Sequence, residues 1–229
     1  MNIKNAAEAY AAQANALKDG GADVIWIETI SSIEEATAAV IGAKETNLPI
    51  VLTMSIDSNG RTMMGVSPSE ITKLQSQLPV KPTAFGANCG LGASEVIAAI
   101  INMQIDTDLS SAAPVLVAKG NCGIPEWIDG QITYSGNPQL MAKYATMAID
   151  AGARLVGGCC GTTPAHVSTM REAIDDYIKK PRPTIEEIES TLGNLSAGTR
   201  AQMGGDMTRL GGATTPRSPR KRKRSRKSD

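Results

Sequence analysis

The sequence has 229 residues, of which 41% are hydrophobic and 20% are charged, as is usual for globular proteins. Its apolar runs are far shorter than the roughly 20 residues that a membrane-spanning helix needs, and the first residues lack the apolar core of a signal peptide. We therefore expect no membrane-spanning segment and a cytoplasmic location. The few aromatic residues argue against a nucleic-acid module that relies on base stacking.

The net charge is zero, but the charges are unevenly distributed. Eight Lys and Arg residues lie between Arg217 and Lys227, so the rest of the chain is acidic. This terminal stretch contains no large apolar residue with which it could fold. We expect a folded domain over residues 1–192 and a disordered tail with a basic run over residues 193–229. An acidic body also argues against nucleic acid as a partner.

Helical segments and short apolar runs alternate along the chain. An alanine-rich helix over residues 3–18 precedes the first run, and a final helix is expected from residue 164 to residue 179. The five predicted strand cores cover residues 24–28, 50–55, 83–88, 114–119 and 154–158. Each is continuously apolar and is followed by a helix, which is typical of parallel strands buried on both faces. The sequence therefore predicts an α/β fold.

Polar residues and glycines gather just after the carboxyl ends of these strands, where parallel sheets and barrels bind their ligands. All four cysteines, at positions 89, 122, 159 and 160, lie at this edge. Adjacent cysteines rarely bond to each other, so metal binding or catalysis is a better interpretation than disulfides. Three thiolates from two strand ends can hold one zinc ion and leave its fourth position open. A thiol bound there would ionise near neutral pH and could accept an alkyl group.

Two motifs at this edge, GANCG at 86–90 and GGCCGT at 157–162, resemble those of the zinc-dependent homocysteine S-methyltransferases. The resemblance implies that Cys89, Cys159 and Cys160 bind Zn²⁺. It also implies that Glu28, in VIWIET, contacts the substrate amino acid. The implied reaction transfers a methyl group from a small-molecule or cofactor donor to the thiol of homocysteine and gives methionine.

The family fold is an eight-stranded (β/α)8 TIM barrel, and the five βα units seen here correspond to its last five strands. The resemblance therefore implies an amino-terminally truncated member. The first and last strands of such a remnant would have free edges, so we expect aggregation, loose packing or self-association, a homo-oligomer included. A zinc-binding remnant without catalytic activity is the alternative function.

Several residues at or near this edge allow two interpretations. Glu28 ends a strand in solvent or pairs with an ammonium group, and we favour the second. Asn88 either shapes its turn or binds substrate. We interpret Cys122 as a small lining residue and His166 as a capping or surface residue. The methionines of the segment at 57–65 are expected to pack in the core rather than to line a pocket.

Overall fold

The computed structural model describes residues 2–57, 59–104, 115–123 and 125–206. Its main sheet contains five parallel strands. In spatial order these are β1 (Ile25–Ile30), β2 (Ile50–Ser55), β3 (Ala84–Cys89), β4 (Val115–Gly120) and β7 (Leu155–Gly158). A separate antiparallel hairpin, β5 (Pro125–Ile128) and β6 (Gln131–Tyr134), follows β4. The predicted parallel α/β architecture is confirmed.

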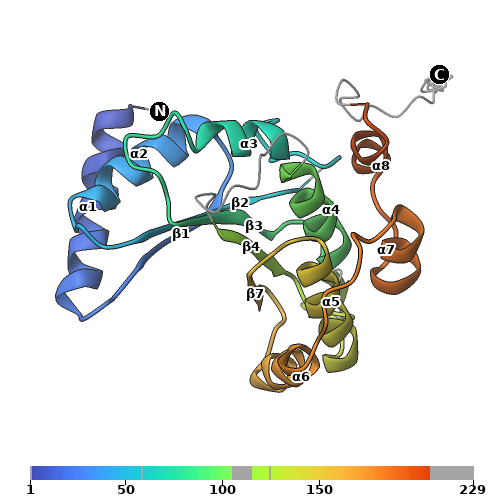
Figure 1. The fold of residues 1–229 in the computed structure, drawn as a ribbon. Coiled ribbons are helices and arrows are strands. Elements are labelled where there is room, and N and C mark those ends of the chain that lie inside the picture. Colours follow the sequence, from blue (N-terminus) through green and yellow to red (C-terminus); the bar gives the residue numbers. More distant parts are fainter. Residues whose placement is uncertain (1, 58, 105–114, 124, 207–229) are drawn as a thin grey trace, which may run out of the picture.

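The helices lie along one side of the curved sheet (Figure 1). They are α1 (Ile3–Asp19), α2 (Ile33–Lys44), α3 (Pro68–Leu74), α4 (Ala93–Met103), α5 (Pro138–Asp150), α6 (Pro164–Asp175), α7 (Ile185–Leu192) and α8 (Ala197–Met203). Several begin at a hydroxyl residue, as at Ser67, whose Oγ accepts the Glu70 N–H while the Glu70 carboxylate accepts the Ser67 N–H. No helix among the described residues is long and apolar enough to cross a membrane.

Alternate residues of each strand face the two sides of the main sheet. The helix side holds most of the core, including Ile27 and Leu52. The opposite side, which we call the inner face, carries a smaller apolar cluster formed by Val51, Ala84 and Val117. Strand β2, which has a neighbouring strand on each side, is buried along its whole length, as predicted. Strands β1 and β7 are partly exposed because each lies at one edge of the sheet.

Consecutive parallel strands with helices on one side are the arrangement of a (β/α) barrel segment. In the described residues β1 pairs only with β2, and β7 pairs only with β4. Both strands therefore present one edge whose backbone groups have no neighbouring strand. Self-association through these edges stays a prediction.

The carboxyl-terminal boundary expected at residue 192 is wrong, because α8 folds beyond it. Buried Glu95 at the start of α4 accepts hydrogen bonds from the backbone N–H of Ser196, at 2.6 Å, and from the hydroxyl of Thr199. Polar contacts rather than a row of apolar side chains anchor this segment. Its sequence therefore shows little of the apolar periodicity from which a packed helix could be predicted. Residues 207–229, which include the basic run, lie outside the described residues.

The methionines of the 57–65 segment are a second correction. Met63 is 78% exposed and Met64 is 67% exposed, so neither packs in the core. They lie in a turn after β2, where the Gly65 N–H donates to the Thr62 carbonyl.

Candidate metal centre

Three cysteine thiols converge at the carboxyl edge of the main sheet. Cys89 ends β3, whereas Cys159 and Cys160 follow β7, and β4 lies between these two strands. The three Sγ atoms all lie within 4.8 Å of one another, and those of Cys89 and Cys160 are 3.9 Å apart. The structure thus brings together the three cysteines that the sequence motifs single out.

The spacing of these sulfurs fits one zinc ion. Zinc–sulfur bonds of about 2.3 Å at tetrahedral angles place two ligand sulfurs about 3.8 Å apart, close to the distance between Cys89 and Cys160. Three protein thiolates would leave one tetrahedral position for a further ligand. Cys122 is not in this group, because it is fully buried in the main core. Its backbone N–H donates to the Cys160 carbonyl at 2.9 Å.

The register of the sheet explains why sequence-distant cysteines meet. Gly120 of β4 pairs with Cys89 on one side and with Gly158 on the other, so both cysteine loops leave the sheet at the same level. The turn after Cys89 requires Gly90, which has a φ of +67°. A Cβ atom at that position would lie 1.9 Å from the Ile56 carbonyl oxygen.

Asn121 holds the two cysteine loops together. Its Nδ2 donates to the Gly90 carbonyl at 2.8 Å, and its Oδ1 accepts the Cys160 N–H at 3.2 Å. Sequence reasoning placed Asn121 at the strand end but gave it no role. The signal that could have found it is the triplet Asn-Cys-Gly, which occurs at 88–90 and again at 121–123.

Asn88 connects the metal centre to β1. It is fully buried, and its Nδ2 donates to the Thr29 hydroxyl at 2.7 Å while its Oδ1 accepts the Thr29 N–H at 3.0 Å. The same Nδ2 lies 4.0 Å from the Cys159 sulfur. Thr29 has a φ of +63°, at a point where the pairing of β1 with β2 shifts. Asn88 thus shapes β1 beside Glu28, and a direct role in substrate binding stays a prediction.

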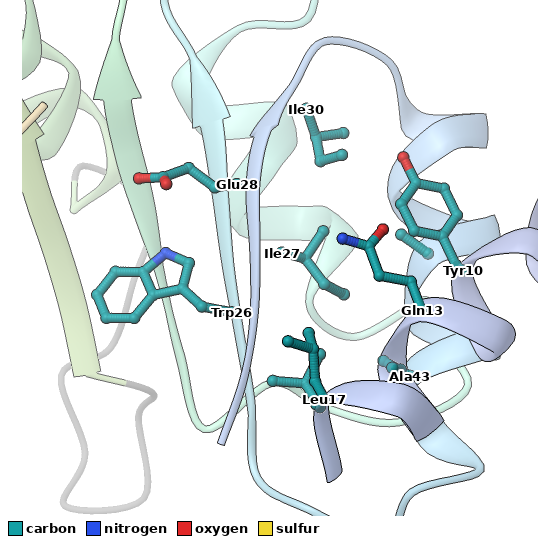
Figure 2. Close-up of a pocket in the computed structure, with 11 residues that line it drawn as sticks. Tyr10, Gln13, Leu17, Trp26, Ile27, Glu28, Ile30 and Ala43 are labelled. Atoms are coloured by element: carbon teal, nitrogen blue, oxygen red, sulfur yellow. The ribbon is translucent and has the colours of Figure 1, made fainter. Parts of the chain in front are cut away.

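Glu28 has an ammonium partner within the chain, the side chain of Lys119 on β4. The Lys119 Nζ also lies 5.1 Å from the centre of the Trp26 ring, within the range of a cation–π contact. Figure 2 shows Trp26 and Glu28 on the same side of β1, opposite Tyr10 and Leu17. Sequence reasoning placed Lys119 at the strand end but gave it no role, although it is the one charged residue in the predicted strand at 114–119.

A groove follows the unpaired edge of β1. It has a volume of about 250 Å³, and residues of α1 such as Gln13 and Leu17 line it together with Ile27 and Ile30 (Figure 2). The cysteines do not line this groove. Glu28 and Trp26 line it as well, so the groove borders the Lys119–Glu28 ion pair.

The electrostatics of the cysteine cluster favour a bound cation. Burial, together with the nearby Cys159 and Cys160 thiols, raises the pKa of the Cys89 thiol to about 12. Burial and a hydrogen bond with Cys160 also raise the pKa of Tyr134, on the β5–β6 hairpin. Three adjacent thiolates repel one another, so they need a positive ion among them to lose their protons near neutral pH.

The only histidine of the sequence takes a capping role, as expected. The Nδ1 of His166 lies 2.7 Å from the Thr163 hydroxyl and accepts the Thr163 N–H at 3.1 Å. These contacts close the first turn of α6. His166 is not part of the cysteine group.

Comparisons with known proteins agree with this geometry. The sequence model of the family named homocysteine S-methyltransferase matches residues 1–174. Among solved structures, the homocysteine methyltransferase MmuM from Escherichia coli is similar in its apo form, with 25% identity and a TM-score of 0.56. That match covers 73% of this chain and 57% of the MmuM chain.

Two further structures of the same enzyme also match. The metallated form has 25% identity and a TM-score of 0.56, and the match covers 72% of this chain and 51% of that chain. The oxidized form has 26% identity and a TM-score of 0.54, with coverages of 72% and 52%. This chain therefore spans about half the length of the MmuM chains. From the match over residues 1–174 it follows that the chain belongs to the homocysteine S-methyltransferase family.

Proposed function

We propose that the chain binds one Zn²⁺ ion through Cys89, Cys159 and Cys160 and methylates the thiol of homocysteine to give methionine. The observation that carries this proposal is the convergence of three thiols from two strand ends, all within 4.8 Å of one another. Membership of the family and the similarity to a metallated form of MmuM support it. The methyl donor is proposed to be a small molecule or a cofactor.

The chain's own residues would hold and orient the reacting groups. Zinc at this site would stabilise the thiolate of an incoming thiol, so that no separate general base is needed. Asn88 would fix the position of the Cys159 sulfur, and Asn121 would fix the loop that carries Cys160. Glu28 would bind the ammonium group of the amino acid. The thiols must stay reduced for this role, so we propose that the protein works in the cytoplasm.

The metal ligands can be tested by X-ray absorption on the zinc-loaded chain. We expect about three sulfur ligands without homocysteine and about four with it, because the substrate thiol would occupy the open position. Methionine formation is then measured with sulfonium, quaternary ammonium and methylcobalamin donors. A sulfur count that homocysteine does not change would contradict the proposal.

A metal-binding remnant without catalytic activity is the second candidate. It is favoured by the unpaired edges of β1 and β7, which leave the arc of strands open in the described residues. An open arc admits water to the inner face and weakens the electrostatic control that catalysis requires. This candidate predicts binding of zinc and homocysteine without methionine formation from any of these donors.

A further inference from the structure

Lys119 is a charged side chain on the inner face of the main sheet that the proposed reaction does not yet use. It lies two residues after inward-facing Val117, so it projects to the same side of β4. Its Nζ pairs with Glu28 of β1 and lies over the Trp26 ring. The side chains of Lys119 and Glu28 are 23% and 35% exposed, so a ligand can reach both charges.

The position of Lys119 relative to the cysteines follows from the strand register. Lys119 pairs with Asn88 on one side and with Gly157 on the other. The next residue, Gly120, pairs with Cys89. The Lys119 side chain therefore leaves β4 one residue before the level of Cys89, an offset of about 3.3 Å along the strand. The lysine stem runs over Gly157, because a Cβ atom at Gly157 would lie 3.5 Å from the Lys119 Cγ, an ordinary van der Waals distance.

The ion pair is chemically complementary to the head group of an α-amino acid, which carries an ammonium and a carboxylate on one carbon. Such a head group can enter between the two side chains, with its ammonium on the glutamate and its carboxylate on the lysine. Every charge then keeps an opposite partner, whereas a ligand that carries only an ammonium would leave the lysine without one. Four covalent bonds separate the carboxylate carbon of homocysteine from its sulfur, a short reach that suits this one-residue offset.

We propose that Lys119 binds the α-carboxylate of the amino acid whose thiol reaches the metal centre, while Glu28 binds its ammonium group. This inference rests on the proposed function and extends it from the thiol to the amino acid head group. The Lys119–Glu28 pair selects free amino acids over thiols that carry a single charge.

The test compares three thiols that differ only in their head groups. L-homocysteine carries both charges, 4-sulfanylbutanoate lacks the ammonium, and 3-aminopropane-1-thiol lacks the carboxylate. Binding to the full chain loaded with Co²⁺ is followed through the absorption of the metal–thiolate bond, which needs no methyl donor. Lys119→Met is expected to weaken homocysteine and 4-sulfanylbutanoate by about tenfold or more, the loss of one charge-assisted contact. It should not weaken 3-aminopropane-1-thiol.

Glu28→Gln gives the mirror pattern, in which homocysteine and 3-aminopropane-1-thiol lose affinity and 4-sulfanylbutanoate does not. Lys119→Arg keeps the positive charge and should recover most of the carboxylate-dependent affinity. Lys143→Met, on an exposed site of α5, is the matched control and should change none of the three affinities.

Three results would overturn the inference. Equal weakening of all three thiols by Lys119→Met would assign Lys119 a purely structural role. Unchanged or tighter binding of homocysteine and 4-sulfanylbutanoate would show that Lys119 only competes for Glu28. Failure of every thiol to bind the wild-type chain would overturn the proposed function together with this inference, whereas the first two results would leave the proposed function intact.

Discussion

Replacement of Asn88 by alanine tests how the metal centre and β1 are joined. The substitution removes both hydrogen bonds to Thr29 and the contact with the Cys159 sulfur. Each bond to Thr29 contributes about 1 kcal/mol to stability. These bonds hold Thr29 in a left-handed conformation that costs a non-glycine residue about 1–2 kcal/mol. We therefore expect Asn88→Ala to lower the free energy of unfolding by about 2 kcal/mol.

A second substitution separates the strain at Thr29 from the loss of packing. Glycine adopts a φ of +63° without the steric cost, so Thr29→Gly should stabilise the Asn88→Ala chain. The double variant should be about 1 kcal/mol more stable than the sum of the two single effects predicts. The free energies come from urea unfolding of the metal-free chain, so that loss of metal does not contribute.

Asn102→Ala is the matched control, because Asn102 is also buried but lies on α4. Its effect should add to that of Thr29→Gly within about 0.5 kcal/mol. The reasoning would be refuted if Asn88→Ala changed stability by less than about 0.5 kcal/mol, or if Asn88→Ala and Thr29→Gly were simply additive.

Three more predictions concern the carboxyl terminus, the cysteine cluster and the turn that follows β3. Removal of residues 207–229 should leave the melting temperature unchanged. Removal of residues 194–229 should lower it, because only this deletion removes α8. Equal melting temperatures for the two shortened chains would contradict the docking of α8 on α4. The Cys89 thiol holds its proton more tightly in the folded chain than in the unfolded chain. The free energy of unfolding of the metal-free chain should therefore fall as the pH rises from about 9 to about 12. Urea titrations of Cys89→Ser should show a smaller fall. Gly90→Ala should lower the free energy of unfolding by several kcal/mol, because the new Cβ would overlap a backbone carbonyl. Gly65 has a similar φ but open space around it, so Gly65→Ala should lower the free energy of unfolding by only about 1 kcal/mol in the same assay. Equal losses would refute the close approach at Gly90.

Much of the sheet and the cysteine cluster could be predicted because their signals are local. Continuous apolar runs mark buried parallel strands, and such strands end at one common edge. This rule places all four cysteines at that edge, and the resemblance of the GANCG and GGCCGT motifs then selects Cys89, Cys159 and Cys160. The β5–β6 hairpin was also within reach, because Asp129 and Gly130 form an Asp-Gly turn signal between two short runs of strand-forming residues, and both have positive φ.

The polar contacts between distant segments could not be predicted in the same way. Lys119 is 91 residues from Glu28, and Glu95 is 101 residues from Ser196. Each partner separately fits a solvent-exposed interpretation, and only the curvature of the sheet or the path of the carboxyl terminus brings the pair together. For the same reason the folded part was expected to end before α8.

The central claim is tested most directly by the zinc content of the purified, reconstituted chain and of its cysteine variants. We predict about one zinc per wild-type chain and per Cys122→Ser chain, because Cys122 lies outside the thiol cluster. Cys160→Ser should lose most of the bound metal, since serine removes one of only three thiolate ligands. A Cys160→Ser chain that keeps one tightly bound zinc, or a wild-type chain that binds none, would contradict the account.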